Sequence, residues 1–228
     1  MNKQLALKGQ MSDSFLTAIF VVLSGGFQDA YTYICRGGVF ANAQTGNIVL
    51  LSTSLFKNDR QNILKYLIPI IAFLIGTALA ELVHMRLKNF EKIHWRQIIL
   101  LCEIFLLFSV GFLPSSKDHL ANALVSFVCA LQVQTFHKIR GHIYASTMCI
   151  GNMRSGTESL CAYFRTKDKG ALHKALTYFS VIIIFGIGAG VGSALADFWG
   201  IEAIWVCCVL LLVSFSLMFV KEKQKHCA

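Results

Sequence analysis

The sequence has 228 residues, of which 55% are hydrophobic and only 14% are charged. Soluble globular proteins carry about 25% charged residues, and the mean hydropathy of +0.59 excludes an ordinary soluble domain. The formal charge of +9 does not indicate a nucleic-acid partner, because the cations stand in short connectors beside apolar runs, where they mark membrane topology and attract lipid headgroups.

Apolar segments bounded by charged residues follow one another along the chain. There are eight of them, at 14–35, 39–56, 66–85, 97–114, 119–137, 143–163, 175–196 and 203–220. A helix needs roughly 20 mostly apolar residues to cross a bilayer. The second and sixth segments contain many small or polar residues, so six full spans with two partial ones remain an alternative to eight. The sequence predicts one all-α domain over residues 1–228, a polytopic transmembrane helical bundle of six to eight membrane segments.

An internal repeat organises these segments. The order Gln28, Arg36-Gly37, Ala41, Gly46-Asn47 recurs as Gln132, Arg140-Gly141, Ala145, Gly151-Asn152, with one residue inserted after the alanine. Tyr66, Phe73 and Ile75-Gly76 recur at a constant offset as Tyr178, Phe185 and Ile187-Gly188. The matches predict two repeats, about 1–114 and about 115–228.

The orientation of the repeats depends on the number of crossings. Four crossings per repeat give parallel repeats, whereas three crossings and one re-entrant segment give inverted repeats. With eight crossings and an inside N-terminus, the basic cluster at 86–96 lies outside, against the positive-inside rule. The sequence alone therefore leaves the topology open.

Polar stretches interrupt the apolar runs at matching positions, 36–47 and 140–152. Non-helical backbone inside a bilayer must be satisfied by protein or by water in a cavity, and paired interruptions point to the binding site of a transporter. Gly46-Asn47 and Gly151-Asn152 are expected to open helices whose amide ends face an anionic group. The alternative is that these glycines form tight turns and the asparagines bond across helices without any ligand.

Ionisable groups also occur inside apolar runs. Charges there are costly and usually face the interior in pairs. Arg154 and Glu158 are four residues apart and can pair on one helical face. Asp29 and Glu103 have no local partner, which makes them candidates for a proton- or cation-coupled carboxylate, or alternatively hydrated groups at a headgroup boundary. The candidate counter-ions are Arg36, Arg140 and Arg154.

The predicted substrate-binding residues combine these stretches and charges: Asp29, Asn42, Gln44, Thr45, Gly46, Asn47, Glu103, Gln132, Ser146, Thr147, Gly151, Asn152, Arg154 and Glu158. We predict no enzyme, because the hydrolase, metalloprotease and phosphate-binding motifs are missing. We predict no metal or cofactor, because no two cysteines form a C-x-x-C pair. The small-residue spacings of Gly76 with Ala80 and of Gly188 with Gly192, extended by Gly186 and Gly190, predict close helix packing.

Two stretches carry a family resemblance, GGFQDAYTYICRGGVFANAQTGNIVLL and ALQVQTFHKIRGHIYASTMCIGNMRSGTESL. They resemble the YoaK-type family of small bacterial membrane proteins, whose domain of unknown function covers nearly the whole chain. Thr45-Gly46-Asn47 matches the T-G-N of that family, whereas Ile150-Gly151-Asn152 departs from it, and Glu103 is similar to a glutamate early in the fourth segment. The resemblance implies a multi-pass protein of the bacterial inner membrane and brings no activity.

The function predicted from these features is a small secondary transporter or permease for a small solute, with its site between the two repeats. The alternative is a non-transporting membrane scaffold or accessory subunit. A membrane enzyme acting on a lipid is a third hypothesis, for which the sequence provides no cluster of polar groups. The expected partners are membrane lipids and a small-molecule substrate but not nucleic acid, and a homo-oligomer is left open.

Overall fold

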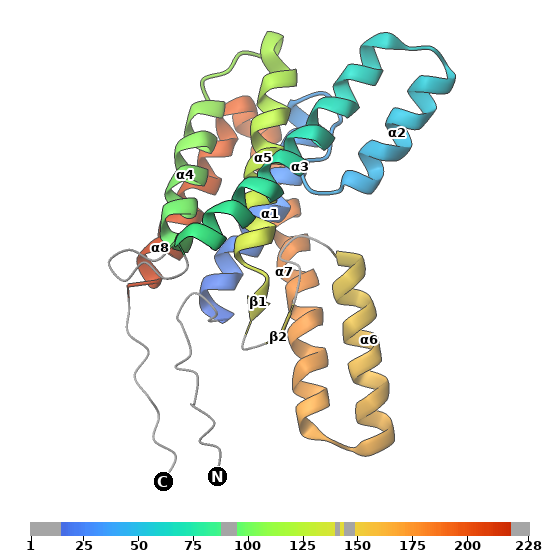
Figure 1. The fold of residues 1–228 in the computed structure, drawn as a ribbon, viewed down its shortest axis with the longest axis vertical. Coiled ribbons are helices and arrows are strands. Elements are labelled where there is room, and N and C mark those ends of the chain that lie inside the picture. The colour runs from blue at the N-terminus through green and yellow to red at the C-terminus, as the bar shows by residue number, and fades with distance from the viewer. Residues whose placement is uncertain (1–14, 88–94, 140–141, 144–148, 220–228) are drawn as a thin grey trace.

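The computed structural model describes residues 15–87, 95–139, 142–143 and 149–219. This part of the chain is almost entirely helical (Figure 1). Its α-helices are α1 (Phe15–Cys35), α2 (Gln44–Phe56), α3 (Arg60–Leu87), α4 (Trp95–Val110), α5 (Asp118–Thr135), α6 (Cys149–Thr166), α7 (Lys169–Trp199) and α8 (Trp205–Leu217). The remaining elements are the short helices η2 (Ser115–Lys117) and η3 (Gly200–Ile204), and the two-residue strands β1 (Lys138–Ile139) and β2 (His142–Ile143).

Each predicted apolar segment overlaps one of these α-helices, but the boundaries differ in a regular way. Helices α3 and α7 begin well before their apolar runs, because an aspartate in front of each accepts backbone amides. Asp59 accepts from Asn62 N at 3.3 Å, and Asp168 accepts from Gly170 N at 2.9 Å. Such capping stabilises a helix start regardless of hydropathy. Helices α2 and α6 begin later than predicted: the turn before α2 is not helical, and residues 144–148 before α6 lie outside the described residues.

Large apolar side chains cover the outside of the bundle. They include Leu74, Ile75, Phe105, Ile183, Val209 and Phe219, whose exposed fractions lie between 57% and 71%. A soluble monomer rarely exposes so much contiguous apolar surface. The exterior of the long helices is therefore suited to lipid rather than to water.

Contacts fix the directions of the helices around α1. Near the end of α1, the Arg36 carbonyl accepts a hydrogen bond from Asn122 at 2.8 Å, close to the start of α5. Near the start of α1, the Thr17 carbonyl accepts from Ser214 at 3.4 Å, close to the end of α8. Helices α5 and α8 are therefore both antiparallel to α1.

The remaining long helices follow from their own contacts. Trp205 at the start of α8 donates to the Phe108 carbonyl near the end of α4 at 3.1 Å, so α4 runs against α8. Gly76 and Glu81 of α3 meet Phe127 and Gln134 of α5 in the same order along both helices. Helix α7 runs parallel to α1 in the same manner. Helices α1, α4 and α7 thus run one way, and α3, α5 and α8 run the other.

Two short helices form separate arms. Helix α2 packs along α3, and α6 packs along α7. In Figure 1 the α2–α3 arm lies toward the top and the α6–α7 arm toward the bottom of the bundle. Neither short helix passes through the bundle from one end to the other.

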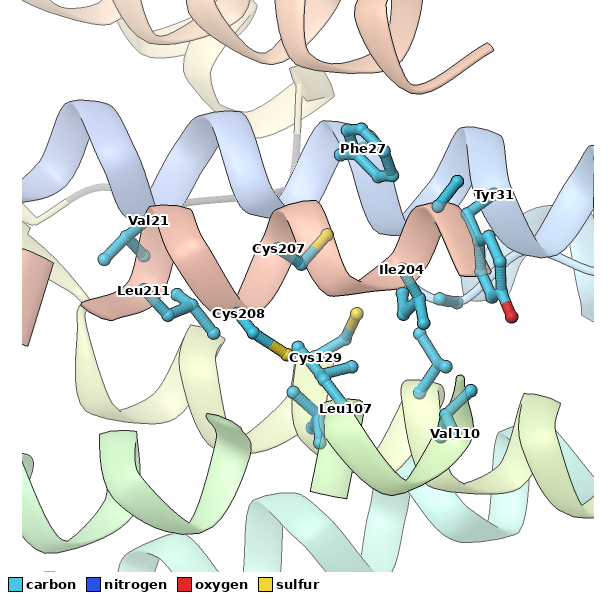
Figure 2. Packing of buried hydrophobic residues seen from close by; sticks show 14 of the residues in the cluster. Val21, Phe27, Tyr31, Leu107, Val110, Cys129, Ile204, Cys207, Cys208 and Leu211 are labelled. Atoms are coloured by element: carbon cyan, nitrogen blue, oxygen red, sulfur yellow. The ribbon is translucent and has the colours of Figure 1, made fainter. Parts of the chain in front are cut away.

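The main hydrophobic core lies between α1, α4, α5 and α8. Figure 2 shows Phe27 and Tyr31 of α1, Cys207 and Cys208 of α8, and Cys129 of α5 in this core. Smaller clusters join α1 to α7, around Val22 and Tyr178, and α3 to α5, around Ala80 and Leu131. The cysteines of the core are free thiols that pack as small apolar side chains.

Glycines bring the helices of two parallel pairs, α3 with α5 and α1 with α7, into backbone contact. A Cβ atom at Gly76 of α3 would lie 2.6 Å from the Phe127 carbonyl oxygen of α5. A Cβ at Gly188 of α7 would collide with the Leu23 carbonyl oxygen of α1, and one at Gly192 would lie 2.9 Å from the Phe27 Cα. A Cβ atom at Gly186 or Gly190, by contrast, would meet no atom of the described residues within 4 Å apart from its own stretch of helix backbone.

We expect Gly188→Ala to destabilise the protein and Gly186→Ala to leave it unchanged or slightly more stable. The added methyl group at residue 188 meets backbone, which cannot rotate away, and such overpacking costs about 1–3 kcal/mol. At residue 186 the methyl group is free, and alanine favours the helix by about 1 kcal/mol over glycine. Thermal unfolding in detergent, followed by size-exclusion chromatography, measures both. Equal melting temperatures for the two variants would contradict the close α1–α7 contact.

Candidate functional site

Two glutamine side chains meet where α1 and α5 cross. Gln28 Nε2 lies 3.4 Å from Gln132 Oε1 and donates to Ser24 Oγ at 2.9 Å. Cys129 Sγ donates to Gln28 Oε1 at 3.0 Å. Both glutamines are fully buried. Gln132 is a predicted site residue, whereas Gln28 is not. The signal for Gln28 in the sequence is that the repeat makes it the equivalent of Gln132.

Asp29, the next residue of α1, holds the interruption that precedes α2. Its Oδ1 accepts the Asn42 backbone N–H at 2.7 Å, and the backbone amides of Ala41 and Ala43 also interact with its carboxyl group. The Asn42 side chain donates to the Gly25 carbonyl at 3.1 Å. Gly25 is the middle residue of the 21-residue helix α1. The interruption therefore reaches the middle of α1 before α2 begins.

The interruption is closed on itself by the predicted amide residues. Asn47 accepts the Phe40 N–H at 3.1 Å and donates to the Phe40 carbonyl at 2.6 Å and to Gln44 Oε1 at 3.0 Å. Gln44 donates to the Ala41 carbonyl at 2.7 Å. The chain enters this turn through Gly37 and Gly38, whose φ values of +82° and +78° favour glycine. Of the remaining predicted residues, Thr45 is exposed and Gly46 packs against the Phe40 ring.

The second interruption is described only from its end. Ser146 and Thr147 lie outside the described residues. Cys149, the first residue of α6, interacts electrostatically with Asp29. Asn152 is buried in the first turn of α6, and Gly151 beside it is exposed. The carboxyl group of Asp29 thus lies near the start of both short helices.

Glu103 occupies the core on α4, and its exposed fraction is 0%. Neither of its carboxyl oxygens has a hydrogen-bond partner in the described part of the chain. The Cys129 thiol interacts electrostatically with both Glu103 and Asp29. Burial rules out hydration at a headgroup boundary as the explanation for Glu103 in this structure.

Arg154 and Glu158 pair with each other, as their spacing predicts, at 2.9 Å. Their side chains are 82% and 62% exposed, on the face of α6 that points away from α7. An exposed pair of this kind contributes little to stability. The described contacts do not join either residue to Asp29, Glu103 or the glutamine pair.

Arg36 is fully buried and makes contacts in four directions. Its guanidinium donates to Tyr31 Oη at 2.8 Å, to Asp118 Oδ1 at 3.0 Å, and to the carbonyls of Val110 and Leu113 at 3.1 and 2.9 Å. Its carboxylate partner is therefore Asp118, and the expectation that Arg36 is the counter-ion of Asp29 or Glu103 is wrong. Arg36 instead ties the end of α1 to the connection between α4 and α5.

In the described part of the chain, an almost entirely helical bundle with an apolar exterior and buried polar contacts is typical of an integral membrane protein. Within the described residues, Arg60–Leu87 and Lys169–Leu217, with hydropathies of 2.1 and 2.2, are long and apolar enough to cross a membrane by length and composition alone.

Comparison with known proteins places the chain in a family. It belongs to the family described as "Protein of unknown function (DUF1275)", whose model matches residues 17–217. It is 28% identical over 199 residues to the "UPF0700 transmembrane protein YoaK" of Bacillus subtilis (strain 168), a match covering 83% of this chain and 87% of that protein. No solved structure matches. The YoaK-type resemblance is confirmed, and the relative supports a membrane location for this chain.

We expect Arg36→Lys to lower stability although it conserves the charge. An ammonium group cannot reach the hydroxyl, the carboxylate and both carbonyls at once, and buried carbonyls left without partners cost about 1–3 kcal/mol each. Arg60→Lys, at an exposed position, is the matched control and should melt like the parent. A melting temperature of Arg36→Lys equal to that of the control would contradict the assigned role.

Proposed function

We propose that this protein is a small secondary transporter whose solute site lies at Asp29, between the starts of α2 and α6. The observation that carries the proposal is the position of the Asp29 carboxyl group, which binds the backbone of the first interruption at the middle of α1 and interacts with Cys149 at the start of α6. Short helices that begin near the middle of a membrane are typical of transporter binding sites. The starts of two such helices supply amide groups for a polar solute.

The proposed repeats are supported by equivalent contacts. Gly76 and Gly188 are repeat equivalents, and so are Phe127 and Leu23 at the offset of Gln132 and Gln28. Gly76 lies against the Phe127 carbonyl and Gly188 against the Leu23 carbonyl. Equivalent helices such as α1 and α5 run in opposite directions. These relations favour inverted repeats, each with three crossings and one short helix.

Six crossings also give a consistent charge distribution. Chain segments attached to the helix ends on the side where α1 starts hold fifteen lysines and arginines: Lys3, Lys8, Arg86, Lys88, Lys92, Arg96, Lys138, Arg140, Arg165, Lys167, Lys169, Lys174, Lys221, Lys223 and Lys225. Those on the other side hold five: Arg36, Lys57, Arg60, Lys65 and Lys117. By the positive-inside rule, the basic side is cytoplasmic. The cluster at 86–96, which contradicts eight crossings, then obeys the rule.

Cysteine labelling tests the number of crossings. Ser116→Cys and Lys169→Cys lie on opposite sides of the membrane with six crossings and on the same side with eight. In intact cells, a membrane-impermeant maleimide should label Ser116→Cys above the background of the native cysteines. Lys169→Cys should be labelled only after lysis. Labelling of both residues from one side would exclude the six-crossing topology.

Transport is tested with purified protein in proteoliposomes and a panel of labelled small solutes. We expect Asp29→Asn to reduce uptake at least tenfold, because the amide provides a weaker acceptor for the Asn42 N–H and removes the charge at the site. Asp168→Asn is the matched control, since asparagine caps a helix as well as aspartate does. Equal uptake by Asp29→Asn and the parent would remove Asp29 from the mechanism.

The alternative function is a scaffold or accessory subunit. It predicts no uptake of any solute by the parent protein and stable co-purification with a membrane partner. Water accessibility at the interruption separates the two proposals, since a carrier must wet this site in one of its states and a packed scaffold need not.

A further inference from the structure

Glu103 is the most isolated buried acid in the described part of the chain. Both of its carboxyl oxygens lack a hydrogen-bond partner there, although the side chain is fully buried. The residues one turn away on either side, Leu100 and Leu107, are fully buried as well. An ionised carboxylate in such surroundings carries a large desolvation cost unless a partner compensates it. The carboxyl group therefore requires a ligand of its own.

The α5 helix supplies further unpaired oxygen atoms at the same depth. Glu103 lies seven residues before Val110, where α4 ends, and Ser126 lies eight residues after Asp118, where α5 begins. The two helices are antiparallel, so both residues are about two turns from the connection. Ser126 Oγ and, one turn earlier, Asn122 Oδ1 are buried and have no partner among the described residues. Cys129 follows one turn later.

The charged groups of this bundle are engaged elsewhere. Arg36 is committed to Asp118 and to backbone carbonyls. Arg96, two turns earlier on α4, has its guanidinium 5.5 Å from the centre of the Trp95 ring. On α3, which also packs on α4, the His84 ring lies 4.7 Å from that of Trp95.

The other titratable groups near Glu103 are thiols and one acid. Cys102 adjoins it on α4, Cys129 approaches from α5, and Cys208 of α8 contacts the Ile104 carbonyl at 3.7 Å. Cys207 and Asp29 are within electrostatic reach of Cys129. None of these groups brings a positive charge to Glu103.

We propose that Glu103 is a proton-binding site at the centre of the α1–α4–α5–α8 bundle, with Ser126 and Cys129 as its polar surroundings on α5. Binding adds one proton from water to the carboxylate and forms a single O–H bond, so no other reactant is needed. The described residues contain no group of three or more histidine, cysteine or acidic side chains that could hold a metal ion. A proton requires only the carboxyl group itself.

A proton at this position identifies the coupling ion of the proposed carrier. The Cys129 thiol is within electrostatic reach of both acids, which places Glu103 and the acid that holds the first interruption in the same part of the bundle. This coupling role rests on the proposed transport function. Proton binding by Glu103 does not, and it can be measured without any solute.

Infrared difference spectroscopy of the purified protein tests the proposal. Spectra are recorded at neutral and strongly alkaline pH in sodium-free buffer. We expect the wild type to contain a C=O stretching band of a protonated carboxyl group at neutral pH, and Glu103→Gln to lose it. Glu81→Gln is the matched control, because the Glu81 side chain is 47% exposed and paired with Gln134. It should retain the band, as should Asp29→Asn.

Other outcomes decide against the proposal. A neutral-pH wild-type spectrum without the band, or a band that Asp29→Asn removes and Glu103→Gln retains, would overturn it. Loss of the band on adding sodium at constant pH would assign the site to a metal cation instead. If Glu103→Gln does not fold, wild-type protein labelled with carbon-13 in the glutamate carboxyl groups shows whether the band belongs to a glutamate. Glu103 is then the assignment among the described glutamates, since Glu81, Glu158 and Glu202 are at least partly exposed. Absence of solute uptake, by contrast, would affect only the transport proposal.

Discussion

The polypeptide leaves helical geometry between α1 and α2 beside the buried middle of α1, where a backbone amide needs an acceptor. The Asp29 carboxylate meets this requirement for residues 41–43 from within the protein. Asn42 and Asn47 complete the closure by bonding to carbonyls of α1 and of the turn itself. The position of α2, and with it the shape of the candidate site, depends on this one acid.

A second buried charge secures the end of the same helix. Arg36 satisfies two carbonyls at the end of α4 and one carboxylate at the start of α5, so the α4–α5 connection and α1 are fixed together. Tyr31, which accepts from Arg36, donates in turn to the Ile201 carbonyl between α7 and α8. Arg36 and Asp29 thus have different roles. Arg36 joins the end of α1 to the α4–α5 connection, whereas Asp29 binds the non-helical turn before α2.

Hydropathy predicts most of the helices of this architecture. Each of the eight apolar segments overlaps one α-helix in the described part of the chain, and the repeat predicts that Gln28 and Gln132 are equivalent, although not that they meet. The directions of the helices could not be predicted, because hydropathy is indifferent to whether a polar segment crosses or turns back. The boundaries of α3 and α7 were underestimated because a capping aspartate extends a helix into charged sequence.

The candidate site was also predicted only in part. The sequence predicts polar residues at the interruption, and Asn42 and Asn47 are buried there, while the predicted Gln132 is buried on α5. It cannot tell an amide that closes a turn from one that faces a ligand, because both uses need the same side chain. Arg36 was one of three candidate counter-ions for Asp29 and Glu103, and its partner is instead Asp118, which is distant in sequence and adjacent only in the fold.

The arrangement of the parallel helix pairs has a consequence for biosynthesis. Helix α1 emerges from the ribosome before the other helices of the bundle, yet the glycine face that covers it belongs to α7, which is synthesised more than a hundred residues later. During this interval α1 is exposed to lipid or to the insertion machinery with its buried polar side chains uncovered. The bundle cannot assemble helix by helix in the order of translation, and its final closure awaits the last third of the chain.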